Sequence, residues 1–213
     1  MAAKETLIFI HGLWMSGAES RWLRRHLETR FGFESSTFGY RTVSEPLSNV
    51  LERLQETVSR ARADRVHVIG HSLGGIIGFR YFERFRDAPP GRVVFLGSPL
   101  CGSQAARGLE RFSIGQRLIG RLAMQELLGE QQRRWKVDRP LGVIAGTRPV
   151  GLGRLFAGFS EPNDGTVAVR ETRIEGAADH LVLPVSHLGM MLSTRVADEC
   201  GRFLRDGRFS LGD

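Results

Sequence analysis

The 213-residue chain, with 41% hydrophobic and 25% charged residues, is long enough to bury one substantial core and too short for two comfortable domains. Its early apolar run, residues 7–10, is too short for a signal peptide, and no run approaches the roughly 18 residues of a membrane span, so we expect a cytoplasmic protein. The net charge is +7, but the arginines are scattered among glutamates and no nucleic-acid motif accompanies them, so we expect no nucleic-acid partner.

The predicted elements alternate between strands and helices. Strands are predicted over residues 6–10, 34–38, 65–70, 92–97, 141–146 and 180–185, which are short runs, most of them apolar. Apolar residues at helical spacing predict a helix before Phe31, one over 46–62 with Pro46 in its first turn, and a closing helix from Leu188. The predicted fold is therefore α/β: a mostly parallel central sheet of about six strands, flanked by helices on both faces. In such a sheet, chemistry lies at the carboxyl ends of the strands.

The loop after the third predicted strand holds a candidate nucleophile. The segment Gly70-His71-Ser72-Leu73-Gly74 matches the pattern G-x-S-x-G between an apolar strand and a buried helix. A nucleophile elbow needs this setting, because its serine adopts a strained backbone conformation between small neighbours. The dipole of the following helix also favours negative charge developing at the serine. The alternative, an ordinary serine N-cap, explains the serine but not the two glycines.

The first predicted strand ends in the segment "FIHGLW", residues 9–14. A glycine at this point lets the backbone turn sharply and present an amide to a pocket. We therefore predict an oxyanion hole made by the backbone N–H groups of Leu13 and Leu73. His11 has two interpretations, a catalytic base or a residue that orders the loop by hydrogen bonding. Its place directly before the glycine favours the ordering role.

Three segments together, "HGLW", "GHSLGG" and "LGSPLCGS", resemble the α/β-hydrolase superfamily. Within it they are similar to the small bacterial lipase and esterase branch, including GPI-inositol deacylase-like and triacylglycerol lipase-like proteins. The likeness spans residues 6–206 and implies a minimal version of the fold, because the chain starts almost at the "HG" strand. It also implies a chain order of nucleophile, acid and histidine, each in a loop after a strand.

That order selects the other two members of a Ser-His-Asp triad. Asp164 follows the fifth predicted strand in a turn that resembles the D-G-x-V acid motif of this branch, with Glu161 as a nearby rival. The alternative for this segment is an Asn-Asp-Gly turn without chemistry. His187 follows the last strand, whereas His180 begins it and would lie at the wrong end of the sheet. His187 would accept the Ser72 proton, and Asp164 would fix its tautomer.

Apolar side chains are predicted to border the serine. They are Trp14, Met15, Leu152, Leu155, Phe156, Phe159, Leu188, Met190 and Met191. Such a site favours an acyl chain or another hydrophobic portion of an ester, although packing in the core explains these residues equally well. Residues 103–139 are interpreted either as a helical cap or lid insertion or as an ordinary packing helix, which is favoured. As a lid, this segment would bring its arginines to an anionic lipid surface.

The leading hypothesis is a serine carboxylic-ester hydrolase of the esterase or lipase type, acting on a small-molecule ester through an acyl-enzyme. Two alternatives stay open: an acyltransferase with the same nucleophile, and a non-catalytic binding protein on a hydrolase scaffold. No cofactor and no metal are expected, because the histidines, carboxylates and cysteines lack metal-ligand spacing and a serine triad needs no metal.

Overall fold

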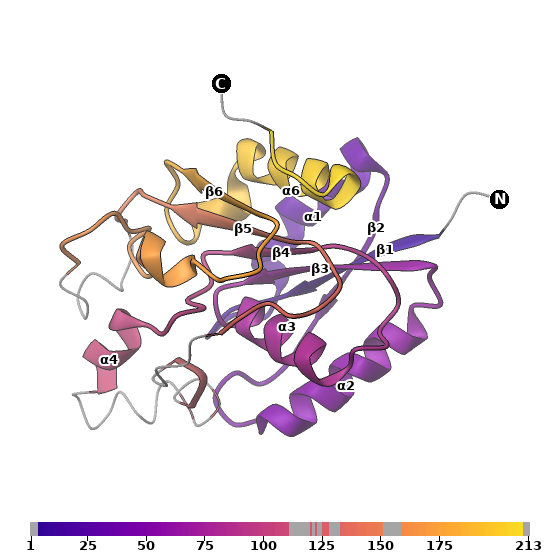
Figure 1. Cartoon of the computed structure of the whole chain (residues 1–213), viewed down its shortest axis with the longest axis horizontal. Coiled ribbons are helices and arrows are strands. Elements are labelled where there is room, and N and C mark those ends of the chain that lie inside the picture. The colour runs from indigo at the N-terminus through magenta and orange to yellow at the C-terminus, as the bar shows by residue number, and fades with distance from the viewer. Residues whose placement is uncertain are drawn as a thin grey trace.

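Six parallel strands form the central sheet of the protein (Figure 1). The computed structural model describes residues 4–110, 120, 122, 125–127, 133–150 and 159–210. The strands are β1 (Glu5–Ile10), β2 (Glu34–Phe38), β3 (Arg65–His71), β4 (Val93–Leu96), β5 (Leu141–Gly146) and β6 (Asp179–Leu183). Their order across the sheet is β2-β1-β3-β4-β5-β6, and every neighbouring pair is parallel. The predicted α/β fold is therefore confirmed.

Helices cover both faces of this sheet. Helices α2 (Leu47–Arg60) and α3 (Leu73–Arg84) lie on one face, and α1 (Arg21–Phe31) and α6 (Thr194–Asp206) lie on the other (Figure 1). Shorter helices are η1 (Ala18–Ser20), α4 (Gln104–Glu110), η3 (Val169–Thr172) and η4 (Gly189–Leu192). Successive β1 side chains point to opposite faces, so Ile8 and Ile10 join the cluster under α2 and α3, whereas Leu7 and Phe9 join the cluster under α1 and α6.

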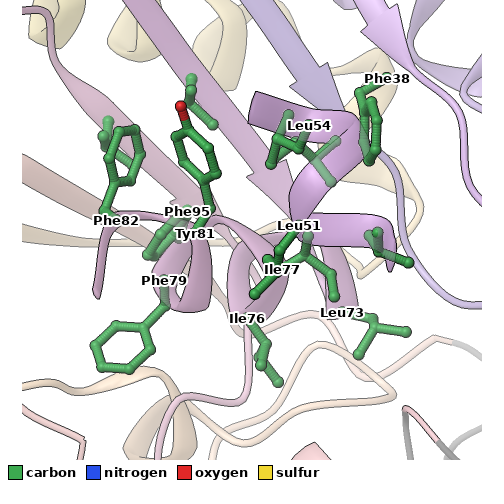
Figure 2. Close-up of a cluster of buried hydrophobic side chains, with 14 of the residues drawn as sticks. Phe38, Leu51, Leu54, Leu73, Ile76, Ile77, Phe79, Tyr81, Phe82 and Phe95 are labelled. Carbon is green, nitrogen blue, oxygen red and sulfur yellow. The ribbon is translucent and has the colours of Figure 1, made fainter. Parts of the chain in front are cut away.

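The cluster under α2 and α3 fixes the helix that follows the candidate nucleophile. Figure 2 shows Ile77 of α3 beside Leu51 of α2. The same buried cluster includes Leu73 and Ile76 of α3 and Leu54 of α2. Burying side chains of this size stabilises the fold by about 1.5–3 kcal/mol each. The start of α3 is therefore anchored over the core.

The C-terminal region differs in detail from its prediction. The closing helix does not run on from Leu188, because the chain forms η4, becomes extended at Ser193 and only then enters α6. The Ser193 side chain accepts a hydrogen bond from the Val196 amide at 3.3 Å, which is the preferred role of serine at a helix start. Pro46 likewise precedes α2 as an extended residue rather than lying in its first turn. The break at Ser193 separates η4 from α6, so η4 belongs to the loop between β6 and α6.

Part of the segment 103–139 packs against the core. Leu122, Leu127 and Trp135 are buried in the cluster under α2 and α3. Most of residues 111–132 lie outside the described residues, so the cap or lid stays a prediction. Within the described part of the chain, none of the helices combines the length and apolar character needed to cross a membrane.

Candidate functional site

Ser72 occupies a sharp turn between β3 and α3. Its φ is 55° and its ψ is −121°, a conformation that residues other than glycine rarely adopt. A Cβ atom on Gly70 would lie 2.6 Å from Gly75 Cα, and one on Gly74 would lie 2.1 Å from the Ile10 carbonyl oxygen. Both glycines are therefore required by close packing of strand and helix. The serine side chain makes no capping hydrogen bond to the helix, which argues against the ordinary N-cap alternative.

Asp164 and His187, from the loops after β5 and β6, form a hydrogen-bonded pair. His187 Nδ1 lies 2.7 Å from Asp164 Oδ2, and the His187 amide donates to the Asp164 carbonyl at 2.9 Å. The other carboxylate oxygen, Oδ1, accepts the amides of Thr166 and Val167 at 2.9 and 2.7 Å. Because the carboxylate accepts from Nδ1, this nitrogen carries the imidazole proton and Nε2 keeps its lone pair. The pair thus holds a histidine in the tautomer that a general base needs.

Gly97 connects this pair to the turn at Ser72. The Ser72 amide donates to the Leu96 carbonyl at 2.9 Å, which attaches the turn to the end of β4. The next residue, Gly97, has a φ of 53°, and a Cβ there would lie 2.9 Å from Asp164 Oδ2 and 3.0 Å from His187 Nδ1. The pair therefore packs directly on the backbone that holds the turn. In the sequence, Gly97 is only a glycine at the carboxyl end of a predicted strand, within the motif "LGSPLCGS". The motif does not reveal that this glycine contacts Asp164 and His187.

His71, the residue before the candidate nucleophile, touches the candidate base. Its Nε2–H donates to the His187 carbonyl at 3.1 Å, and the two ring centroids lie 4.6 Å apart. Complete burial, then the proximity of His187, lowers the pKa of His71 well below its ordinary 6.5, so the ring is neutral. Sequence reasoning missed this contact, because a motif position cannot indicate a partner 116 residues away.

The structure brings two of the three predicted triad residues into direct contact and puts the third on the adjoining turn. Within the described part of the chain, no hydrogen bond joins the Ser72 hydroxyl to His187. In serine enzymes without substrate such contacts are often long, and they tighten when substrate binds.

The two predicted oxyanion donors lie beside Ser72, one on the loop after β1 and the other at the start of α3. Leu73 is the first residue of α3, so its amide has no acceptor within the helix. The loop that carries Leu13 is also close, because a Cβ on Gly12 would lie 3.1 Å from Ser72 Cβ. Among the described residues, the Leu13 amide finds no hydrogen-bond acceptor. Both amides are thus available for an oxygen on the substrate.

His11 orders the loop after β1, as its sequence position favours. Its Nδ1–H donates to the Gly12 carbonyl at 2.9 Å, and its Nε2 accepts the Tyr40 amide at 3.4 Å. The His11 ring stacks on Tyr40 at 4.5 Å, and the Tyr40 hydroxyl donates to the His11 carbonyl. Burial lowers the pKa of His11, so its neutral ring serves as a structural link.

The rival acid and base have other partners. His180 lies near the amino end of β6 and its Nε2 contacts the Thr172 hydroxyl at 2.9 Å, as expected for the wrong end of the sheet. Glu161 forms an ion pair with Arg170. Over the described ranges of the chain, no group of three or more histidine, cysteine, aspartate and glutamate side chains forms a metal site.

A second buried carboxylate lies seven residues after Asp164. Glu171 accepts the Gln104 amide at 2.6 Å and the Ala168 amide at 2.9 Å, so it ties the start of α4 to η3. Burial raises the pKa of this carboxyl group. The sequence analysis did not single out this residue.

The apolar residues expected around the serine divide into two groups. Trp14 and Leu188 are 57% and 60% exposed, whereas Met190 and Met191 are buried in the cluster under α1 and α6. Leu152, Leu155 and Phe156 lie outside the described residues. Five exposed large apolar residues lie in loops after strands, on the edge of the sheet that carries Ser72: Trp14, Val43, Val150, Leu188 and Leu192. The apolar character thus belongs to the rim of the site.

A cavity of about 730 Å³ lies beside the oxyanion loop. His11, Met15 and Ser16 line one side of it, and the other side comes from the loop between β2 and α2 and from Arg53 of α2. Arginine, glutamate and serine side chains contribute much of its wall. Apolar atoms, among them those of Met15 and Pro46, form the remainder, so the wall at the Met15 side of the site is mixed rather than wholly apolar.

Comparisons with known proteins agree with this architecture. The model described as "Alpha/beta hydrolase family" matches residues 7–201. The mature lipase BlEst2 of Bacillus licheniformis shares 18% identity and a TM-score of 0.69, over 90% of this chain and 88% of that one. The pyrethroid hydrolase PytH shares 15% identity and a TM-score of 0.64, over 95% and 98%. The RedJ thioesterase of Streptomyces coelicolor shares 15% identity and a TM-score of 0.62, over 94% and 90%. No curated protein sequence matches the chain.

Proposed function

Because the chain belongs to the α/β-hydrolase family, we propose that it is a serine hydrolase of carboxylic esters that works through an acyl-enzyme. The observation that carries the proposal is the Asp164–His187 hydrogen bond of 2.7 Å, packed on Gly97 next to the strained turn of Ser72. The lipase and pyrethroid hydrolase of similar fold support an ester substrate.

In the first half of the proposed reaction, Ser72 Oγ attacks the ester carbonyl carbon and its proton passes to His187 Nε2. The carbonyl oxygen becomes an oxyanion, which the amides of Leu13 and Leu73 stabilise. The intermediate then breaks the bond to the alcohol oxygen. That oxygen takes the proton from Nε2 and the alcohol leaves, so Ser72 is acylated.

In the second half, water attacks the acyl carbon and gives a proton to His187 Nε2. Collapse of this intermediate breaks the bond to Ser72 Oγ, which recovers the proton as the carboxylic acid departs. In both halves the carboxylate of Asp164 stabilises the imidazolium and keeps Nδ1 as its donor.

A fluorophosphonate probe tests the nucleophile, because it phosphonylates activated serines. We expect the wild-type protein to be labelled and Ser72→Ala to be unlabelled, with kcat for a chromogenic ester lowered on the order of 10⁶-fold. Equal labelling of both proteins, or none of the wild type, would falsify the proposal.

Product analysis with a competing alcohol or amine separates hydrolysis from acyl transfer, since both share the acyl-enzyme. Hydrolysis predicts free acid as the main product at high acceptor concentration. The non-catalytic alternative predicts a folded protein that hydrolyses neither short-chain nor long-chain esters.

A further inference from the structure

The cavity beside the oxyanion loop is not lined by Ser72 itself, but one of its lining residues, Met15, lies near Ser72. A Cβ placed on Gly12 would lie 3.1 Å from Met15 Sδ and 3.1 Å from Ser72 Cβ, so these two side chains flank the same point of the backbone. Met15 lines the cavity of about 730 Å³, which is large enough for one portion of a small-molecule ester.

Of the charged side chains that line this cavity, Arg53 and Glu45 form an ion pair, whereas Arg41 forms none with the described residues. Arg53 donates two hydrogen bonds to Glu45, at 2.7 and 2.9 Å, and a third to the Gly39 carbonyl. Glu19, a nearby carboxylate outside the cavity wall, already accepts the Gly17 amide. The anionic side chains around the cavity therefore already have partners.

Arg41 is the cavity cation whose guanidinium makes no direct ion pair with a described residue, although its charge, together with that of Arg53, helps to lower the pKa of the nearby Glu45 carboxyl group. Its guanidinium is exposed and, in the described part of the chain, joins no ion pair. Its backbone amide donates to Glu45 at 3.0 Å, which fixes the residue at the cavity wall. An exposed guanidinium without a direct ion-pair partner, on a backbone held at the cavity wall, is a partner for a carboxylate or phosphate.

We infer that this cavity binds a negatively charged substituent of the ester substrate, and that Arg41 is the side chain that recognises it. This inference rests on the proposed function, because it assigns the substrate of the same site. It gives the charged part of the wall, Arg41, a role that an unsubstituted acyl chain would not use. It also implies that the preferred substrate is an anionic ester, with the scissile carbonyl at Ser72 and its charge beyond Met15.

The test uses two matched pairs of esters. In one pair the charge is on the acyl side (4-nitrophenyl butyrate and 4-nitrophenyl hemisuccinate), and in the other it is on the alcohol side (phenyl acetate and 4-acetoxybenzoate). Rates are corrected with Ser72→Ala to remove spontaneous hydrolysis. We expect the wild type to prefer the charged member of one pair, and Arg41→Gln to lower kcat/KM for that ester about tenfold, mainly through KM. The neutral member should be unaffected.

The control is Arg25→Gln, which removes the same charge from an exposed arginine on α1 that forms no ion pair with the described residues. An equal loss in Arg25→Gln and Arg41→Gln would overturn the inference, because it would show a general effect of net charge. High salt should reduce the preference, since it screens an exposed charge pair.

A second variant tests occupancy of the cavity without changing a charge. Ser44 is an exposed residue of the cavity wall, so Ser44→Trp fills space without disturbing the core. We expect a raised KM for the preferred ester and an unchanged rate of fluorophosphonate labelling. An unchanged KM contradicts the inference.

The two levels of the proposal fail differently. A wild type that is labelled but hydrolyses charged esters no faster than neutral ones overturns the inference and leaves the nucleophile standing. A wild type that is neither labelled nor active on any of the four esters overturns the proposed function, and the inference falls with it.

Discussion

Asp164 and Glu171 are two buried carboxylates on one short segment, and their oxygens accept hydrogen bonds from different kinds of partner. Each accepts two backbone amides, but Asp164 takes both on one oxygen and offers the other to His187. Glu171 uses one oxygen for each amide and joins two segments of backbone. The difference separates a carboxylate that holds the candidate base from one that joins two segments of backbone. Burial alone does not distinguish the two roles.

The largest expected effect comes from Asp164→Asn. The new amide can still accept the Thr166 and Val167 amides, but its NH₂ group faces His187 Nδ1 and favours the wrong imidazole tautomer. We expect kcat for ester hydrolysis to fall by about 10⁴, as such a change does in serine triads. The free energy of unfolding in urea should change little. A large loss of stability with retained activity per folded molecule would reverse the roles of the two carboxylates.

Glu171→Ala should show the opposite pattern. It leaves the amides of Gln104 and Ala168 without their partner, which costs about 1–3 kcal/mol for a buried group. Urea unfolding should detect this loss, while kcat of the folded fraction stays near that of the wild type. A kcat as low as that of Asp164→Asn would place Glu171 in the catalytic machinery and contradict the proposed difference between the two carboxylates.

His71 offers a smaller effect on activity, because it holds the base from the other side. His71→Gln keeps an N–H donor near the position of Nε2, whereas His71→Asn is too short to reach the His187 carbonyl. We expect His71→Asn to lower kcat about tenfold, the value of one hydrogen bond, and His71→Gln to recover most of it.

A pH profile distinguishes positioning from a simple loss of stability. In His71→Asn the apparent pKa of kcat/KM should differ from that of the wild type, because His187 loses a contact that holds it in its present surroundings. His71→Gln should restore the wild-type value. Equal activity and equal profiles in the two variants would show that the contact at 3.1 Å does not position His187.

The smallest effect is a pH dependence of stability from Glu171. Burial raises the pKa of its carboxyl group above the ordinary 4.5, so the folded protein holds this proton more tightly than the unfolded chain does. The stabilisation is present below pH 4.5 and is lost as the pH rises through the raised pKa. The unfolding free energy of the wild type minus that of Glu171→Gln should therefore fall as the pH rises from 4.5 through the raised pKa. A difference that is constant with pH contradicts the prediction.

Sequence patterns predicted the elements better than the contacts between them. Strand and helix periodicity is local, so all six strands and the turn at Ser72 could be anticipated. Chain order then selected Asp164 and His187, which the structure joins by a hydrogen bond. The break at Ser193 was missed because apolar spacing continues through it, although serine is a common helix cap.

The features that sequence reasoning missed depend on segments far apart in the chain. The contact of His71 with His187 and the closeness of Gly97 to the Asp164–His187 pair arise from tertiary packing. The cavity beside the oxyanion loop arises in the same way, from two loops that the sequence separates by a whole helix. No local pattern encodes such a juxtaposition.

Gly97 also sets a limit on how this chain can evolve. Even alanine, the smallest change, adds an atom 2.9 Å from a carboxylate oxygen and 3.0 Å from an imidazole nitrogen, on a backbone that already has a positive φ. In a library of random codons at this position, selected for ester hydrolysis, we expect glycine alone to be recovered. Selection would then leave this codon free to drift only at its third base.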